Sequence, residues 1–243
     1  KLREYGVMNG AVTTEYETID REKLLEDIRS FVIVDAVKSV SCKTIREEKS
    51  EQGLYRVVLM DFGYKRNIVR SLKNRGCDVT IVPSDTPAEE ILAMKPDGIM
   101  LSNGPGDPEE NVEIIAQIKK LLDADVPMFG ICLGHQLTAL ATGAKTVKVK
   151  NGHRGANQPV RDLAHDRTYI TSQNHGYAVQ GDTVDPAVGE ISHINANDNT
   201  VEGVRYKEKA CFTVQFHPEA SAGPQDTSYL FDEFIAMMRK EAK

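Results

Sequence analysis

The feature that most constrains the fold is an alternation of apolar, strand-like runs and helix-like segments between about residues 54 and 143. The expected strands cover residues 57–60, 79–82, 98–101 and 126–131. The expected helices cover residues 67–75 and 87–94, and a third carries Val112, Ile115, Ile118 and Leu122 at helical spacing. This alternation predicts an α/β fold, in which a mostly parallel, doubly wound sheet has helices on both faces.

The pattern changes on both sides of this region. Residues 20–31 predict a helix with Asp20 as its N-cap, and the polar, charged residues 39–53 are typical of a linker. After Lys145 the sequence predicts short β segments with Gly and Asn turns, which form a small antiparallel portion, and then a final helix near 228–239. We therefore expect a helical and linker segment at 1–53 and a single α/β domain at 54–243.

Cys132 lies between two glycines, where the apolar run that ends at Ile131 meets a helix expected over 136–141. A nucleophile on such a strand-to-helix elbow has an accessible side chain with backbone N–H groups nearby, and the helix N-terminus favours a thiolate. The alternative is a buried structural cysteine, because free cysteines are often part of the core.

A second segment supplies a base for this cysteine. Residues 212–216 predict a strand that leads directly into His217-Pro218-Glu219. Alternation along an extended chain places His217 and Glu219 on the same side, where a carboxylate can orient an imidazole. A base and an orienter are what a cysteine nucleophile requires, so we expect Cys132, His217 and Glu219 to form a catalytic triad. The alternative is a surface histidine beside a solvated glutamate.

Two polar loops add candidate binding groups. Residues 102–108 follow an expected strand, and their glycines allow the backbone to approach a ligand, so the N–H groups of Gly104 and Leu133 are candidates for an oxyanion hole. Residues 173–177 contain His175, which is either a second base or a histidine that hydrogen-bonds locally. The asparagine-rich residues 197–199 predict a hairpin turn.

Charge and cysteine usage argue against several other classes. The chain has 30 basic and 36 acidic residues and a net charge of −6, which argues against a nucleic-acid-binding surface. No apolar stretch approaches the ~20 residues of a transmembrane helix, so we expect no membrane association. The cysteines Cys42, Cys77, Cys132 and Cys211 have no CxxC spacing and no neighbouring histidine pairs. We therefore expect no disulfides, no metal site and a cytoplasmic protein, with Cys77 and Cys211 in the core.

Taken together, these motifs resemble those of the triad, or class I, glutamine amidotransferases. Residues 130–136 and 217–219 are similar to motifs shared across that family. Residues 61–68, 102–108, 173–177 and 218–224 resemble the carbamoyl phosphate synthetase branch, and the resemblance covers about 54–240. Residues 1–53 then look like the junction to an absent N-terminal domain, which in the family contributes a serine that helps to hold glutamine. Phe216 and Tyr177 depart from the family pattern, where glycine and phenylalanine are common.

The resemblance implies that the chain is an enzyme that releases ammonia from L-glutamine. Cys132 would form a γ-glutamyl thioester, His217 would move protons, Glu219 would orient His217, and the N–H groups of Gly104 and Leu133 would hold the oxyanion. The residues implied to line the glutamine site are Gly106, Gln136, Asn174, Gly176 and Tyr177.

The resemblance also implies a partner, a large synthetase subunit that uses the ammonia, bicarbonate, ATP and magnesium to make carbamoyl phosphate for pyrimidine or arginine synthesis. No cofactor is expected in this chain, which has no P-loop. Two alternatives remain. One is the glutaminase component of another amidotransferase, of the guanylate or anthranilate type, and the other is a non-catalytic module that stabilises its partner.

Overall fold

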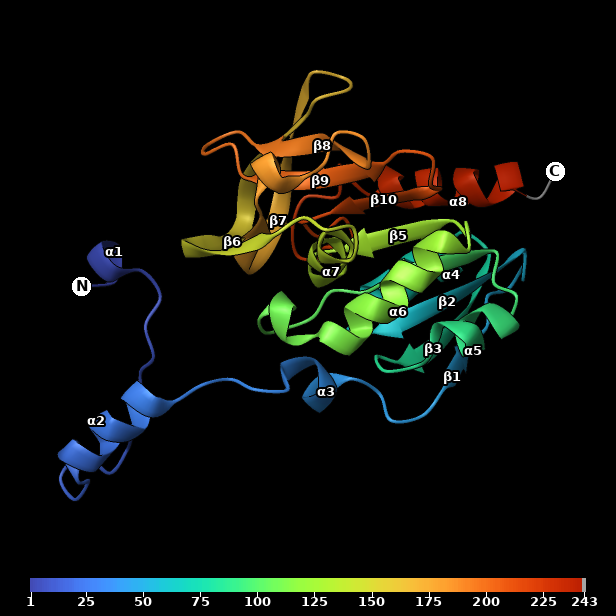
Figure 1. The fold of residues 1–243 in the computed structure, drawn as a ribbon. Helices are drawn as coiled ribbons and strands as arrows, with labels where there is room; N and C mark the ends of the chain where they lie inside the picture. The colour runs from blue at the N-terminus through green and yellow to red at the C-terminus, as the bar shows by residue number, and fades with distance from the viewer. Residues whose placement is uncertain (242–243) are drawn as a thin grey trace.

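A computed structural model of the protein describes residues 1–241, and its centre is one sheet with ten strands among those residues. The strand order is β1-β3-β2-β4-β5-β10-β9-β8-β6-β7 (Figure 1). The strands are β1 (Arg46–Glu48), β2 (Tyr55–Asp61), β3 (Cys77–Pro83), β4 (Gly98–Leu101), β5 (Met128–Ile131), β6 (Thr146–Asp162), β7 (Arg167–Val179), β8 (Gly189–Asn195), β9 (Val201–Tyr206) and β10 (Cys211–Val214).

The helices alternate with these strands along the first part of the chain. The α-helices are α1 (Leu2–Tyr5), α2 (Arg21–Ser30), α3 (Ala36–Val40), α4 (Arg66–Lys73), α5 (Ala88–Ala93), α6 (Val112–Asp123), α7 (Leu133–Ala141) and α8 (Tyr229–Glu241). Two short 3₁₀ helices, η1 (Pro108–Glu110) and η2 (Gly181–Thr183), lie in loops.

Strands β3, β2, β4, β5 and β10 run parallel and form the doubly wound half of the sheet. Val58 and Met60 of β2 pack in a core with α5, α6 and α7, whereas Val57 and Leu59 pack in a second core with α4 and α8. Alternate residues of one strand point to opposite faces, so a strand covered by helices on both sides is apolar throughout. The predicted α/β class is confirmed.

The antiparallel portion continues this sheet from β10 through β9, β8, β6 and β7. The prediction of short β segments after Lys145 is wrong for the outermost pair, because β6 has 17 residues and β7 has 13. Register shifts occur at two places along this pair, between Lys148 and His153 and between Gly155 and Gln158. Such bulges let a long ribbon bend and twist without ending, although its glycines and asparagines resemble turns in sequence.

The N-terminal residues differ partly from the expected linker. Asp20 caps α2 as predicted, because its side chain accepts hydrogen bonds from the N–H groups of Glu22 and Lys23. The polar stretch 39–53, however, contains β1, which pairs antiparallel with β3. All three β1 side chains are exposed, and an edge strand that is held only by main-chain hydrogen bonds needs no apolar pattern. Figure 1 shows α2 away from the sheet, whereas Val7, which follows α1, donates its N–H to the carbonyl of Lys150 on β6 over 3.1 Å.

Cys42, Cys77, Cys132 and Cys211 are all buried, and all are free thiols. Cys77 and Cys211 are core residues as predicted. No helix among the described residues is long and apolar enough to cross a membrane.

Candidate active site

Cys132 lies at the elbow between β5 and α7. Helix α7 begins at Leu133, three residues earlier than expected, so Cys132 is its N-cap residue. The backbone of Cys132 has φ 52° and ψ −101°, a strained conformation for a residue with a side chain. Gly134 makes the sharp turn possible, since a Cβ atom on it would lie 2.5 Å from the carbonyl oxygen of Leu101. The elbow predicted from the sequence is therefore present.

His217 and Glu219 lie at the end of the neighbouring strand. Strand β10 pairs parallel with β5, and the N–H of Cys132 donates to the carbonyl of Val214 over 2.8 Å. Parallel neighbours present their carboxyl ends at one edge of the sheet, so the turn that follows β10 reaches the elbow. His217 Nδ1 lies 2.8 Å from Glu219 Oε1.

The route to this contact differs from the predicted one. Strand β10 ends at Val214, and the N–H of Ala220 donates to the carbonyl of His217, which closes a turn. His217 and Glu219 therefore meet across a turn and not along an extended strand. Pro218 favours this turn because its ring fixes φ near the value that a turn requires.

The electrostatics of the pair favour a charged imidazolium beside a charged carboxylate. Burial opposes a charge on His217, but Cys132 and the Glu219 carboxylate outweigh it and raise the pKa of His217 to about 9. Burial likewise opposes the charge on Glu219, but hydrogen bonding and attraction to His217 and the nearby Lys65 lower its pKa. His217 and Glu219 are 3% and 2% exposed, so little solvent screens this interaction.

Two residues that were not assigned a role hold Glu219 from a third element. Lys65 Nζ lies 3.6 Å from Glu219 Oε1, and the Asn67 side-chain amide donates to the Glu219 carbonyl. Both belong to the segment 61–68, which the sequence marks only by its resemblance to one family branch. Asp61 shapes this segment by accepting hydrogen bonds from the N–H groups of Gly63 and Tyr64. Sequence spacing does not reveal the contact, since Asn67 and Glu219 are 152 residues apart.

The two oxyanion candidates lie close together. Leu133 is the first residue of α7, where a backbone N–H has no acceptor within the helix. Gly104 packs directly against it, because a Cβ atom on Gly104 would lie 2.7 Å from Leu133 Cδ2 and 2.3 Å from the carbonyl oxygen of Phe62. The glycine at 104 thus lets the 102–108 loop approach the elbow.

Gln136 has an internal position in the structure. Its Nε2 donates to the carbonyl of Tyr177 over 2.8 Å and to Gln215 Oε1 over 2.9 Å, and the residue is 3% exposed. It therefore joins α7, one turn after Cys132, to β7 and to the residue that follows β10.

The other residues implied to bind glutamine lie on two segments that meet at Tyr177. Asn174 is exposed, and Gly176 and Tyr177 are half-buried on β7. Burial and the nearby Asp107 carboxylate raise the pKa of the Tyr177 phenol to about 12, and Asp107 belongs to the 102–108 loop that contains Gly106. Gly106 is exposed and has φ 92°, so its conformation favours glycine.

A cavity of about 610 Å³ lies at the same edge of the sheet, between α3, the end of β3 and the start of α6. Asp107 lines it, but Cys132, His217 and Glu219 do not. This cavity is separate from the triad, where Cys132 itself is 4% exposed.

Comparison with known proteins places this geometry in context. Residues 58–237 match the family described as glutamine amidotransferase class-I. The chain is 52% identical over 240 residues to the carbamoyl phosphate synthase small chain of Staphylococcus epidermidis, which covers 98% of this chain and 64% of that protein. It is 50% identical over 243 residues to the corresponding small chain of Bacillus cereus, which covers all of this chain and 65% of that protein. The chain thus spans just under two thirds of the length of these curated relatives.

A solved structure is similar over most of its own length. It is assigned to GMP synthase of Thermoplasma acidophilum, as one of its subunits. The TM-score is 0.68 and the sequence identity 25%, and the match covers 77% of this chain and 96% of that one.

Proposed function

The chain belongs to the class-I glutamine amidotransferase family, and from that premise we propose that it hydrolyses the side-chain amide of glutamine to glutamate and ammonia. The observation that carries the proposal is the buried contact between His217 and Glu219, 2.8 Å long, beside Cys132 on a strained elbow. Together these provide a nucleophile, a base and an orienter.

In the proposed reaction, His217 already holds the proton taken from the Cys132 thiol, and the Cys132 thiolate attacks the amide carbon through Sγ. Glu219 already occupies His217 Nδ1, so Nε2 is the nitrogen that serves Cys132. The oxyanion forms next to the N–H groups of Gly104 and Leu133, which favour the tetrahedral intermediate. His217 then gives its proton to the departing ammonia, which leaves a γ-glutamyl thioester.

Hydrolysis of that thioester completes the cycle. His217 removes a proton from water, the hydroxide adds to the thioester carbon, and the thiol is regenerated as glutamate leaves. Gly106, Gln136, Asn174, Gly176 and Tyr177 are the proposed glutamine-site residues. Their support is that Gln136 lies on α7 and the other four lie on the two segments that meet beside it.

We further propose that the ammonia passes to a large synthetase subunit, which uses bicarbonate, ATP and magnesium to form carbamoyl phosphate. This proposal is supported by about 50% identity to carbamoyl phosphate synthase small chains across nearly all of this chain. Glutamine-dependent carbamoyl phosphate formation by the chain with a carbamoyl phosphate synthase large chain would support it. Stable binding only to a GMP-forming synthetase would contradict it.

Glutamine hydrolysis by this complex tests the triad. Cys132→Ser should lower the turnover by roughly 1,000-fold or more, because a serine hydroxyl is a far weaker nucleophile in this setting. The matched control is Cys42→Ser, which removes another buried thiol and should leave turnover nearly unchanged. Equal turnover in the native chain and in Cys132→Ser would overturn the assignment of the nucleophile.

A further inference from the structure

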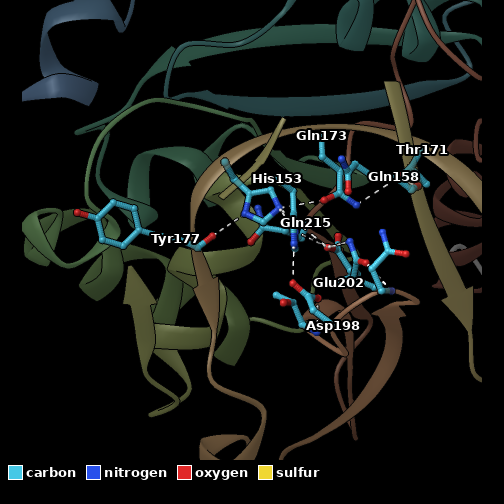
Figure 2. A network of polar contacts seen from close by, with 12 residues as sticks. His153, Gln158, Thr171, Gln173, Tyr177, Asp198, Glu202 and Gln215 are labelled. Atoms are coloured by element: carbon cyan, nitrogen blue, oxygen red, sulfur yellow. Dashed lines mark hydrogen bonds and ion pairs between the residues drawn. The ribbon is translucent and has the colours of Figure 1, made fainter. Parts of the chain in front are cut away.

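Three side chains from three strands converge in the antiparallel half of the sheet, outside the triad. They are His153 on β6, His175 on β7 and Glu202 on β9. Figure 2 labels His153 and Glu202 within the polar network that they share. His153 Nδ1 lies 3.2 Å from His175 Nε2 and 3.4 Å from Glu202 Oε1, and His175 Nε2 lies 3.9 Å from Glu202 Oε1. Three atoms that can each donate an electron pair thus face one another.

The outer nitrogen of each histidine faces a hydrogen-bond acceptor. His153 Nε2 lies 2.9 Å from a carboxylate oxygen of Asp198, and His175 Nδ1 lies 2.8 Å from the carbonyl oxygen of Tyr177. Both outer nitrogens must therefore carry a hydrogen. In neutral rings, this leaves the inner nitrogens, His153 Nδ1 and His175 Nε2, as lone pairs directed at the same point.

Gln173 adds a fourth acceptor whose orientation is determined by its neighbours. The Thr171 hydroxyl donates its single hydrogen to the carbonyl of Gln158, so Thr171 can only accept a hydrogen bond from Gln173 Nε2. The amide oxygen of Gln173 consequently points the other way and lies 3.1 Å from His175 Nε2 (Figure 2). Two nitrogens and two oxygens meet with few hydrogens among them.

The Glu202 carboxylate adds a negative charge to this excess of hydrogen-bond acceptors, and a bound cation would neutralise that charge. Its side chain is 0% exposed, and its Oε2 has no hydrogen-bond partner among the described residues. A buried carboxylate without sufficient partners is costly, and bound metal ions are one way in which proteins neutralise such a group.

We propose that His153, His175 and Glu202 bind a divalent transition-metal ion, zinc in the first instance, with the Gln173 carbonyl oxygen as a fourth ligand. A zinc ion about 2.0–2.1 Å from each ligand needs ligand atoms roughly 3.3 Å apart in a tetrahedron. Three of the four contacts given above, at 3.1, 3.2 and 3.4 Å, are close to that spacing, and one is longer at 3.9 Å.

The chemistry of the ligands and their surroundings supports the same ion. Imidazole nitrogens suit zinc, whereas calcium and magnesium prefer sites built from oxygens alone. Histidines that bind metals usually donate their other N–H to a carboxylate or a carbonyl, and here Asp198 and Tyr177 accept those two hydrogen bonds. The spacing of the cysteines and histidines predicts no metal site, because His153, His175 and Glu202 come together only in the folded chain.

The ion would join β6, β7 and β9 at one point. His175 lies between Asn174 and Gly176, so a bound ion would also restrict the motion of the β7 segment that is proposed to line the glutamine site. Only this last consequence rests on the proposed function. Zinc binding itself is measured without glutamine, so its failure and the failure of the glutaminase proposal are distinguishable.

Zinc stoichiometry and calorimetric titration of the chelator-treated full chain test the proposal. The measurements use a Cys132→Ala background, which removes the triad thiol as a competing zinc ligand. We expect about one zinc ion per chain, a visible absorption band of tetrahedral cobalt when Co²⁺ replaces zinc, and a higher unfolding temperature with zinc. No zinc binding by a folded chain would overturn the proposal, and would indicate that a shared proton holds the cluster.

Substitutions locate the bound ion. Glu202→Gln is nearly isosteric and should abolish the cobalt band, whereas Asp198→Asn should weaken zinc affinity by about 10–100-fold while leaving one site. The matched control is His165→Asn, since His165 also pairs with a carboxylate, that of Asp162, but has an exposed side chain. Unchanged zinc affinity and cobalt absorption in Glu202→Gln would place the ion elsewhere and overturn the assignment. Circular dichroism of each zinc-free variant checks that it folds.

Discussion

At the scale of single residues, the site depends on a cysteine held in a conformation that most residues avoid. A positive φ at a residue with a Cβ costs about 1–3 kcal/mol, and it persists only when the surrounding structure imposes it. Here β10 holds the N–H of Cys132, while α7 begins at the next residue. The elbow directs the thiol to the edge of the sheet where His217 arrives.

The charge of Glu219 is predicted to raise the pKa of His217 together with Cys132. Glu219→Gln keeps the size of the side chain but removes the charge, so the pKa of His217 should fall from about 9 towards its usual 6.5. Histidine NMR titration of the native and variant chains measures this directly. Glutamine turnover in the complex should fall roughly 100-fold or more.

Glu190→Gln is the control, because Glu190 is an exposed residue on β8. It should leave both the titration of His217 and the turnover as they are in the native chain. A pKa of His217 that does not change in Glu219→Gln would show that Glu219 does not stabilise the imidazolium.

At the scale of elements, the elbow requires α7 to pass very close to β4. Gly134 is the point of contact, as its N–H donates to the carbonyl of Ser102 and a Cβ atom on it would lie 2.5 Å from the carbonyl oxygen of Leu101. The partner atom is backbone in the centre of the sheet, so it has little freedom to move. A glycine here is therefore a packing requirement, although it lies inside a helix.

Gly134→Ala separates helix propensity from packing by the sign of its effect. Propensity alone would stabilise the fold by about 1 kcal/mol, because glycine is a poor helix former. The clash should instead lower the free energy of unfolding by about 1–3 kcal/mol, as measured by urea denaturation. Gly10→Ala serves as the control, since a Cβ atom on Gly10 would meet nothing within 4 Å. Stabilisation by Gly134→Ala would contradict the close approach.

At the scale of the whole molecule, buried histidines in different parts of the fold make the free energy of unfolding change in opposite directions with pH. Burial lowers the pKa of His135 to about 3 and that of His193 to about 4, from a usual 6.5. Despite its burial, His217 has a pKa raised to about 9 by Cys132 and Glu219. The first two resist protonation in the folded state, whereas His217 retains its proton.

The free energy of unfolding should therefore be greatest near pH 6.5. Below pH 6.5, His135 and His193 bind protons in the unfolded chain but stay neutral in the folded chain. Stability therefore falls as the pH drops towards 4. Above it, the folded chain holds a proton on His217 that the unfolded chain has lost, so stability falls as the pH rises through 9. Urea denaturation at a series of pH values measures both slopes.

His217→Asn tests which group is responsible for the alkaline slope. The variant should lose less stability than the native chain between pH 6.5 and 9, and the acid slope should be similar in both. Identical alkaline slopes would mean that His217 is not the group that releases its proton there.

The sequence by itself determined the alternation of strands and helices, the elbow at Cys132 and the pairing of His217 with Glu219. Each of these depends on side-chain periodicity or on residues only a few positions apart, which local physical chemistry controls. It missed the edge strand β1, because main-chain pairing leaves no pattern in exposed side chains. The extended conformation predicted from the sequence for His217 to Glu219 is instead a turn at Pro218.

Only the tertiary structure decided which distant side chains meet. Lys65 and Asn67 reach Glu219 because α4 begins at the same sheet edge where β10 ends. His153, His175 and Glu202 converge because strand order places β6, β7 and β9 together and a register shift precedes His153. Strand order, register and bulges arise from packing of the whole chain, so no local pattern in the sequence contains them.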